Sequence, residues 1–130
     1  MPHGIFCWNE LNSHDVEGAK RFYGAVMGWT FEAQPIGEGT YWVAKKDGDS
    51  VAGIYEMKDP RLAGIPEHWL AYIAVDDTDA VARKVKAEKG AVLREPFDVA
   101  GVGRFAIVRD ANGAVFAVLK PLELAKVNRK

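Results

Sequence analysis

The sequence predicts an α+β fold built from two tandem β-α-β-β-β modules. Each half contains a short strand-like segment, an amphipathic helical segment and three further strand-like segments. At an offset of 62 residues, Asp15 aligns with Asp77 and Gly28 aligns with Gly90, so the helix starts and ends coincide in the two halves. The two halves share this order of segments but have few identical residues. It predicts two similar units, each with one apolar sheet face to bury.

The first module is expected at about residues 5–58 and opens with a strand at 5–11. Asp15 is the predicted N-cap of the helix that follows, because its carboxylate can accept from the free amides of the first turn. Gly28 is the predicted C-terminal stop of this helix. Asp47–Gly48 has the composition of a hairpin turn. The three remaining strands of this module are expected at 29–31, 40–44 and 51–55.

A linker is expected at 59–66, where two prolines and a glycine interrupt the pattern. The second module, at about residues 67–122, repeats the plan, with Asp77 as N-cap and Gly90 as helix stop. A turn is expected at 110–113. The strands of this module are expected at 69–75, 91–93, 104–108 and 114–119.

Composition restricts the class of protein. The 130 residues carry 17 Lys and Arg against 18 Asp and Glu, and 48% are hydrophobic, which fits one domain spanning 1–130 with a sizeable core. The near-zero net charge argues against nucleic-acid binding, and no apolar run has the ~20 residues of a membrane span. With Cys7 as the single cysteine and no secretory signal at Met1–Gly4, we expect a cytoplasmic protein. A frayed tail is expected at 127–130.

Several segments carry a resemblance to a known family. In the first half they are Asp15, Phe22–Tyr23 and Gly28–Trp29. In the second half they are Trp69–Asp76, Gly103–Ala106 and Asp110–Phe116. Over nearly its whole length the chain resembles the vicinal oxygen chelate superfamily, which holds glyoxalases, bleomycin-resistance proteins and extradiol dioxygenases. The stretch Cys7–Leu11 with Glu67–Trp69 is most similar to a glyoxalase-like branch.

This resemblance implies a curved, cup-shaped mixed sheet with the helices outside. It also implies where a metal would be held, because metal-dependent members place a ligand, commonly His or Glu, on the first and last strand of each half. Counting from the helix N-caps and the turn glycine gives four matching positions: Trp8, Gly53, Leu70 and Ala117. None of these side chains is a metal ligand. We therefore expect no cofactor, and a divalent metal only if its ligands lie elsewhere.

The implied cup would be lined by small and aromatic side chains. Gly53 and Ala117 would leave volume where relatives place ligands, and Trp8 would line or fill that volume. Such a cleft suits a small organic ligand. The predicted ligand-binding residues are Trp8, Glu10, Gly53, Tyr55, Tyr72, Arg104 and Ala117.

Glu10 is the candidate catalytic residue. Strand alternation puts it on the face of Trp8, where partial desolvation would raise the pKa of its carboxyl and suit a general base. It could equally pair with an arginine or lie in water at the rim. Tyr72 is expected on the same face, as a hydroxyl for a ligand or as core. Arg104 could bind an anionic ligand, neutralise Glu10 or be solvated. Tyr55 is a candidate because it is expected on the same strand face as Gly53.

Three functions remain open at this point. The first is a metal-free, glyoxalase- or bleomycin-resistance-like protein that binds a small, partly hydrophobic molecule. The second is an enzyme, a lyase or an isomerase-, dioxygenase- or hydroxylase-like relative, with Glu10 as general base. The third is a non-catalytic interaction protein whose cup is filled by its own side chains. By analogy with relatives that associate in pairs, we expect a homodimer, with neither nucleic acid nor membrane as a partner.

Overall fold

The computed structural model describes residues 2–36 and 39–122. In this part of the chain the helices are α1 (Val16–Met27), the 3-10 helix η1 (Pro60–Leu62) and α2 (Thr78–Ala87). The strands are β1 (Ile5–Ser13), β2 (Thr30–Ile36), β3 (Gly39–Lys46), β4 (Asp49–Glu56), β5 (His68–Ala74), β6 (Ala91–Val99), β7 (Gly103–Arg109) and β8 (Val115–Pro121). No helix among the described residues is long and apolar enough to cross a bilayer. The tail predicted at 127–130 lies outside the described residues.

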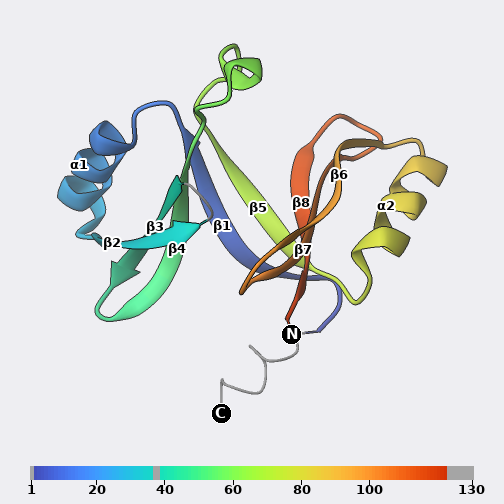
Figure 1. Ribbon diagram of the computed structural model, residues 1–130, viewed down its shortest axis with the longest axis horizontal. Helices are drawn as coiled ribbons and strands as arrows, with labels where there is room; N and C mark the ends of the chain where they lie inside the picture. The colour runs from blue at the N-terminus through green and yellow to red at the C-terminus, as the bar shows by residue number, and fades with distance from the viewer. Residues whose placement is uncertain (1, 37–38, 123–130) are drawn as a thin grey trace. The chain divides into compact units, whose positions relative to one another are not determined.

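The order of elements confirms the α+β class and the tandem β-α-β-β-β modules (Figure 1). Contacts divide the chain into two units: Trp8–Leu70, and the residues up to Cys7 together with those from Ala71 onward. In the first of these units the strand order is β2-β3-β4-β1. Its β2–β3 and β3–β4 pairs are antiparallel, and its β4–β1 pair is parallel. The parallel pair places Glu10 beside Gly53.

The second unit repeats this arrangement with β6-β7-β8-β5. Its β6–β7 and β7–β8 pairs are antiparallel, and its β8–β5 pair is parallel. The parallel pair places Tyr72 beside Ala117, as the corresponding pair in the first unit places Glu10 beside Gly53. The two candidate residues of the first strands therefore occupy equivalent positions, each next to a small residue of its module's last strand.

The start and end of α1 lie where the sequence predicts them. The Asp15 side chain accepts a hydrogen bond from the Gly18 amide at 2.9 Å. Gly28 adopts a left-handed conformation with φ 72°, and its N–H donates to the Gly24 carbonyl at 3.1 Å. Glycine tolerates this conformation because it has no Cβ.

The predicted end of α2 at Gly90 is wrong by a few residues. The helix ends at Ala87, and the non-glycine residue Lys89 takes the positive φ of 71°. Gly90 is needed for a different reason: a Cβ there would run into the Arg109 carbonyl and the Val85 side chain. The glycine thus permits close packing of the chain against β7, which helical periodicity alone does not reveal.

The turns follow their expected chemistry, whereas most strands are longer than predicted. Asp47 and Gly48 both have positive φ, 52° and 86°, which is the requirement of a tight type I′ hairpin. In the turn before β8, one Asp110 carboxylate oxygen accepts from the Asn112 and Ala114 amides at 2.8 and 3.0 Å. The largest difference is β6, which continues to Val99 because irregular pairing accommodates residues that break strict alternation.

Each unit buries one face of its sheet beneath its own helix (Figure 1). In the first unit the cluster on this face contains Leu11, Val16, Ala19, Tyr23, Phe31, Trp42 and Ile54. In the second unit it contains Val75, Val81, Val85, Val92, Ala106, Val108, Phe116 and Val118. Because side chains alternate along a strand, the strand residues that adjoin the members of these clusters point to the opposite face of the sheet. The candidate functional residues Glu10, Tyr72 and Ala117 lie on that opposite face.

Gly103 is a position where the fold demands glycine, and Gly103→Ala tests this. Its φ is 151°, and a Cβ would overlap the Lys120 backbone carbonyl on the neighbouring strand. We expect Gly103→Ala to lower the free energy of unfolding by about 1–3 kcal/mol in urea denaturation. Gly64→Ala is the matched control: a Cβ there meets nothing within 4 Å. The two variants should differ clearly, and equal stabilities would contradict the structure.

Candidate functional site

A buried carboxylate lies at the centre of the candidate site in the first unit. Glu10 is only 7% exposed and Asn12 is 8% exposed. The Asn12 amide donates to Glu10 Oε2 at 3.2 Å. The Tyr41 hydroxyl is hydrogen-bonded to the Glu10 carboxylate and accepts a hydrogen bond from Trp8 Nε1 at 2.9 Å. These contacts form one network, which we call the Glu10 network: Trp8, Glu10, Asn12 and Tyr41.

Strand alternation explains why these residues meet. Trp8, Glu10 and Asn12 are two residues apart along β1, so they share the face opposite to Leu11, which packs under α1. On β3, Trp42 belongs to the α1 cluster, so its neighbour Tyr41 points to the same face as Glu10. The shared face predicted for Trp8 and Glu10 is therefore present.

The volume expected above Gly53 is not free, and this corrects the prediction. A Cβ on Gly53 would overlap the hydroxyl and ring of Tyr41, so the tyrosine lies directly over this glycine. Glycine is required here for close approach, and Tyr41 occupies the space that was expected to receive a ligand. Tyr55, two residues along β4 from Gly53, is 41% exposed.

The surroundings of Tyr41 change its acid–base behaviour. Burial raises the pKa of the Tyr41 hydroxyl above its ordinary value of 10, and the negative charge of Glu10 and the hydrogen bond to it raise this pKa further. The hydrogen bond from Trp8 acts in the opposite direction but is outweighed. Tyr41 therefore keeps its proton and serves as a donor to the Glu10 carboxylate.

In the second unit the candidate residues lie among aromatic rings. Tyr72 is 5% exposed, and its ring stands edge-on to Phe105 at a centroid distance of 5.4 Å. Phe105 stacks on Phe97 at 5.6 Å with an interplanar angle of 21°. Ala117, the register partner of Tyr72, is fully buried. The structure thus gives the Tyr72 ring a packing role, while a role for its hydroxyl stays a prediction.

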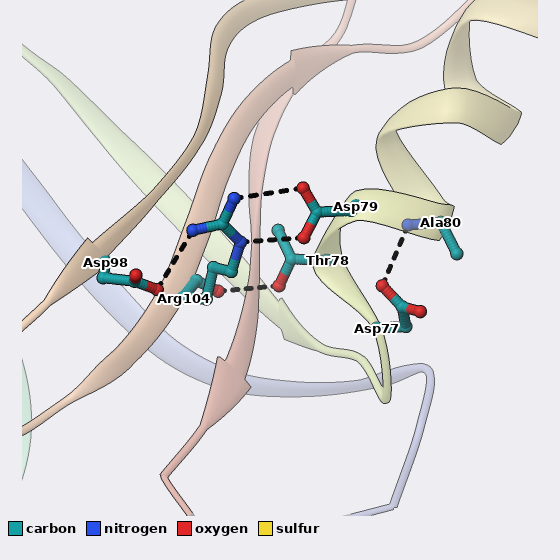
Figure 2. Close-up of polar contacts among 6 residues, drawn as sticks. All are labelled: Asp77, Thr78, Asp79, Ala80, Asp98 and Arg104. Atoms are coloured by element: carbon teal, nitrogen blue, oxygen red, sulfur yellow. Dashed lines mark hydrogen bonds and ion pairs between the residues drawn. The ribbon is translucent and has the colours of Figure 1, made fainter.

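Arg104 lies on the other face of its sheet (Figure 2). Its guanidinium donates to both carboxylate oxygens of Asp79, at the start of α2, at 2.8 and 3.1 Å, and to Asp98 at 3.1 Å. Thr78 Oγ1 donates to the Arg104 carbonyl at 2.7 Å. Because Phe105 points away from α2, its neighbour Arg104 points toward the helix.

This placement gives no support to the predicted ligand-binding role of Arg104. Its guanidinium is engaged by two carboxylates, which would also repel an anionic ligand. The same contact lowers the pKa of Asp79, chiefly through its hydrogen bond from Arg104. Arg104 thus links the start of α2 to β7 and β6. Its contact with a ligand stays a prediction without geometric support.

The residues at the family's ligand positions do not fit a metal. Trp8, Gly53, Leu70 and Ala117 offer no side chain that holds a divalent cation in proteins. Within residues 2–36 and 39–122, no group of three or more His, Cys, Asp or Glu side chains is arranged to hold a metal ion. Glu10 supplies a single carboxylate near these positions, and its partners are a tyrosine and an asparagine.

Sequence reasoning missed four residues on these faces: Asn12, Arg94, Phe97 and Phe105. Asn12 could have been found by extending the alternation of β1 two residues beyond Glu10, because the predicted strand stopped at residue 11. Arg94 and Phe97 lie on β6 beyond its predicted end. Their signal is Pro96, a residue that strands accept at edges and bulges.

Solved structures of other proteins share this fold. A methylmalonyl-CoA epimerase from Mycobacterium tuberculosis superposes with a TM-score of 0.64 at 14% identity, covering 98% of this chain and 95% of that one. A hypothetical protein from Bacillus halodurans superposes with a TM-score of 0.69 at 12% identity, covering 94% and 97% of the two chains. At these identities the likeness concerns the fold alone.

The family follows from sequence comparison. Residues 7–118 match the model of the Glyoxalase/Bleomycin resistance protein/Dioxygenase superfamily, and the chain belongs to this superfamily. A Mycobacterium tuberculosis protein named "Putative glyoxylase CFP32" is 43% identical over 118 residues, which are 91% of this chain and 44% of that protein. The "Anthracycline biosynthesis protein DnrV" of Streptomyces peucetius is 35% identical over 127 residues, 88% of this chain and 46% of the relative. The chain spans less than half the length of these relatives.

The raised pKa of Tyr41 predicts how stability depends on alkaline pH. The folded state holds the proton more tightly than the unfolded chain, so this stabilisation is complete below pH 10 and is lost as the pH rises above 10. For each pH unit above 10, the free energy of unfolding of the wild type should fall by about 1.4 kcal/mol relative to that of Tyr41→Phe, which lacks the ionisable hydroxyl. Urea denaturation at pH 9, 10 and 11 measures this, with Tyr55→Phe, an exposed tyrosine, as control. A constant stability difference between wild type and Tyr41→Phe would contradict it.

Proposed function

We propose that the chain binds a small, partly hydrophobic organic molecule without the help of a metal. The observation that carries this is the Glu10 network, which places an indole, a phenol and a nearly buried carboxylate on the sheet face that α1 does not cover. A buried carboxylate costs stability, and proteins rarely keep one in a purely structural core. Aromatic rings beside a few fixed polar groups are typical of small-molecule sites.

The named relatives support organic small-molecule chemistry. One is named a glyoxylase and another an anthracycline biosynthesis protein, and both match nearly all of this chain. Because the match covers under half of each relative, the activity of those whole proteins is carried to this chain only as part of the proposal. A cytoplasmic location and a homodimer also belong to the proposal, as expectations from composition and family analogy.

A second candidate is an enzyme in which Glu10 is a general base. The hydrogen bonds from Tyr41 and Asn12 would hold the carboxylate in one orientation, which catalysis by proton abstraction requires. In an isomerisation Glu10 would take a proton from an acidic C–H bond of the substrate and return it at another position. In a lyase reaction it would take this proton while the bond to a leaving group on the neighbouring carbon breaks and the electron pair departs with that group. The reaction class would be that of a lyase or an isomerase, without any metal in the step.

The third candidate, an interaction protein with a filled interior, is favoured by one observation. Tyr41 lies over Gly53, so part of the expected ligand volume is taken up by the protein itself. Direct binding measurements separate this candidate from the first two.

The binding proposal predicts that 2-naphthamide, a neutral aromatic probe, binds in isothermal titration calorimetry. Trp8→Ala should weaken this binding about fivefold or more, because a large aromatic contact is lost. Glu10→Gln should change it less than about twofold, because the isosteric amide keeps the shape of the site. Trp69→Ala is the control, since Trp69 belongs to a separate aromatic cluster with Tyr23 and Trp29. Absence of binding to the wild type would support the interaction protein instead.

The enzyme candidate predicts proton exchange that depends on Glu10. Small ketones in D2O should exchange their α-hydrogens faster with the wild type than without protein, as followed by NMR. Glu10→Gln should remove this acceleration, because an amide does not accept the proton. Tyr55→Phe is the control, because it leaves the surroundings of Glu10 unchanged. If Glu10→Gln exchanges as fast as the wild type, Glu10 is not the base.

A further inference from the structure

A ladder of stacked groups crosses the face of the second unit that α2 does not cover. Arg94 lies over the Phe97 ring, with its guanidinium carbon 3.7 Å from the ring centroid. Phe97 stacks on Phe105, and Phe105 meets the edge of Tyr72. We call these four residues, Arg94, Phe97, Phe105 and Tyr72, the aromatic ladder. It runs from an exposed cation to a buried phenol.

The backbone of β6 is irregular in the segment that builds the ladder. Arg94 pairs with Ile107, and Phe97 pairs with Phe105. An interval of three residues on β6 therefore lies opposite an interval of two residues on β7, so β6 contains a bulge. Without this bulge, strict alternation would place Arg94 and Phe97 on opposite faces. The extra residue brings both to the face of Phe105, and bulges often aim side chains in this way near binding sites. The stacking of Arg94 on Phe97 is therefore a result of the backbone.

Arg94 is an exposed cation at one end of the aromatic ladder. Among the described residues no carboxylate forms an ion pair with it, although acidic residues are its near neighbours in sequence. Glu95 pairs with Lys86 at 3.2 Å, and Asp98 pairs with Arg104 at 3.1 Å. An exposed guanidinium held over a ring has N–H donors available for a carboxylate or a similar anion.

From this arrangement we propose that the aromatic ladder binds planar aromatic molecules that carry an anionic substituent. The ring of such a ligand would lie against the edges of the stacked Phe97 and Phe105 rings, and its anionic group would accept hydrogen bonds from the Arg94 guanidinium. This inference rests on the proposed binding of small, partly hydrophobic molecules. It adds the aromatic ladder of the second unit as a binding surface besides the Glu10 network of the first unit, and it names the ligand class for the ladder. It gives Arg94 the anion-binding role that the sequence had suggested for Arg104.

The test compares 2-naphthoate with 2-naphthamide, which has nearly the same shape but no charge, in isothermal titration calorimetry. The wild type should bind 2-naphthoate about tenfold more tightly than 2-naphthamide, and Arg94→Gln should abolish this preference while leaving 2-naphthamide binding within about twofold. Arg83→Gln, which removes an exposed arginine from α2, should keep the preference. Thermal melting of Arg94→Gln confirms that the variant is folded. Backbone amide NMR shifts should place 2-naphthoate at Phe97 and Phe105.

The outcomes separate this inference from the proposed function. If both probes bind equally and Arg94→Gln changes neither affinity, the proposed binding function stands and the anionic ligand class is overturned. If neither probe binds the wild type, both proposals fail. If 2-naphthoate binds but shifts the amides of Trp8 and Glu10 instead of those on β6 and β7, the ladder is not the site.

Discussion

In each unit four strands bury one face beneath the helix of that unit, and this packing determines the surroundings of every candidate residue. Apolar side chains on the helix face form a continuous cluster in each unit, and alternation sends their neighbours to the opposite face. A helix is amphipathic and covers a single face, so the opposite face is left for residues with other properties. In this protein those residues are a buried carboxylate with its donors in one unit and stacked rings with a cation in the other.

The Glu10 network shows how a costly group is retained. The carboxylate has little access to water, and the donors from Tyr41 and Asn12 replace part of the hydration that it loses. Tyr41 reaches this position only because β4 carries glycine at residue 53, where any side chain would collide with the tyrosine ring. The absence of a side chain at Gly53 thus makes room for the tyrosine of a polar network.

Two arginines of the second unit illustrate how local backbone geometry decides function. Arg104 follows the regular alternation of β7 and is directed to α2, where two aspartates engage it. Arg94 lies at a bulge of β6 and is directed to the opposite face, over Phe97. Both are strand arginines, and residue type alone does not tell which face of the sheet each one takes. The difference comes from a one-residue change in strand register.

The sequence alone determined the class of fold, the order of elements, the N-caps of both helices and the two tight turns, because these depend on local spacing and on residues such as Asp15 and Asp47–Gly48. It also predicted the shared face of Trp8 and Glu10, since alternation needs no tertiary information. Only the tertiary structure decided that Tyr41 covers Gly53, that Arg104 belongs to α2, and that a bulge brings Arg94 onto Phe97. These features depend on contacts between strands distant in sequence and on register shifts, which residue patterns within one strand do not record.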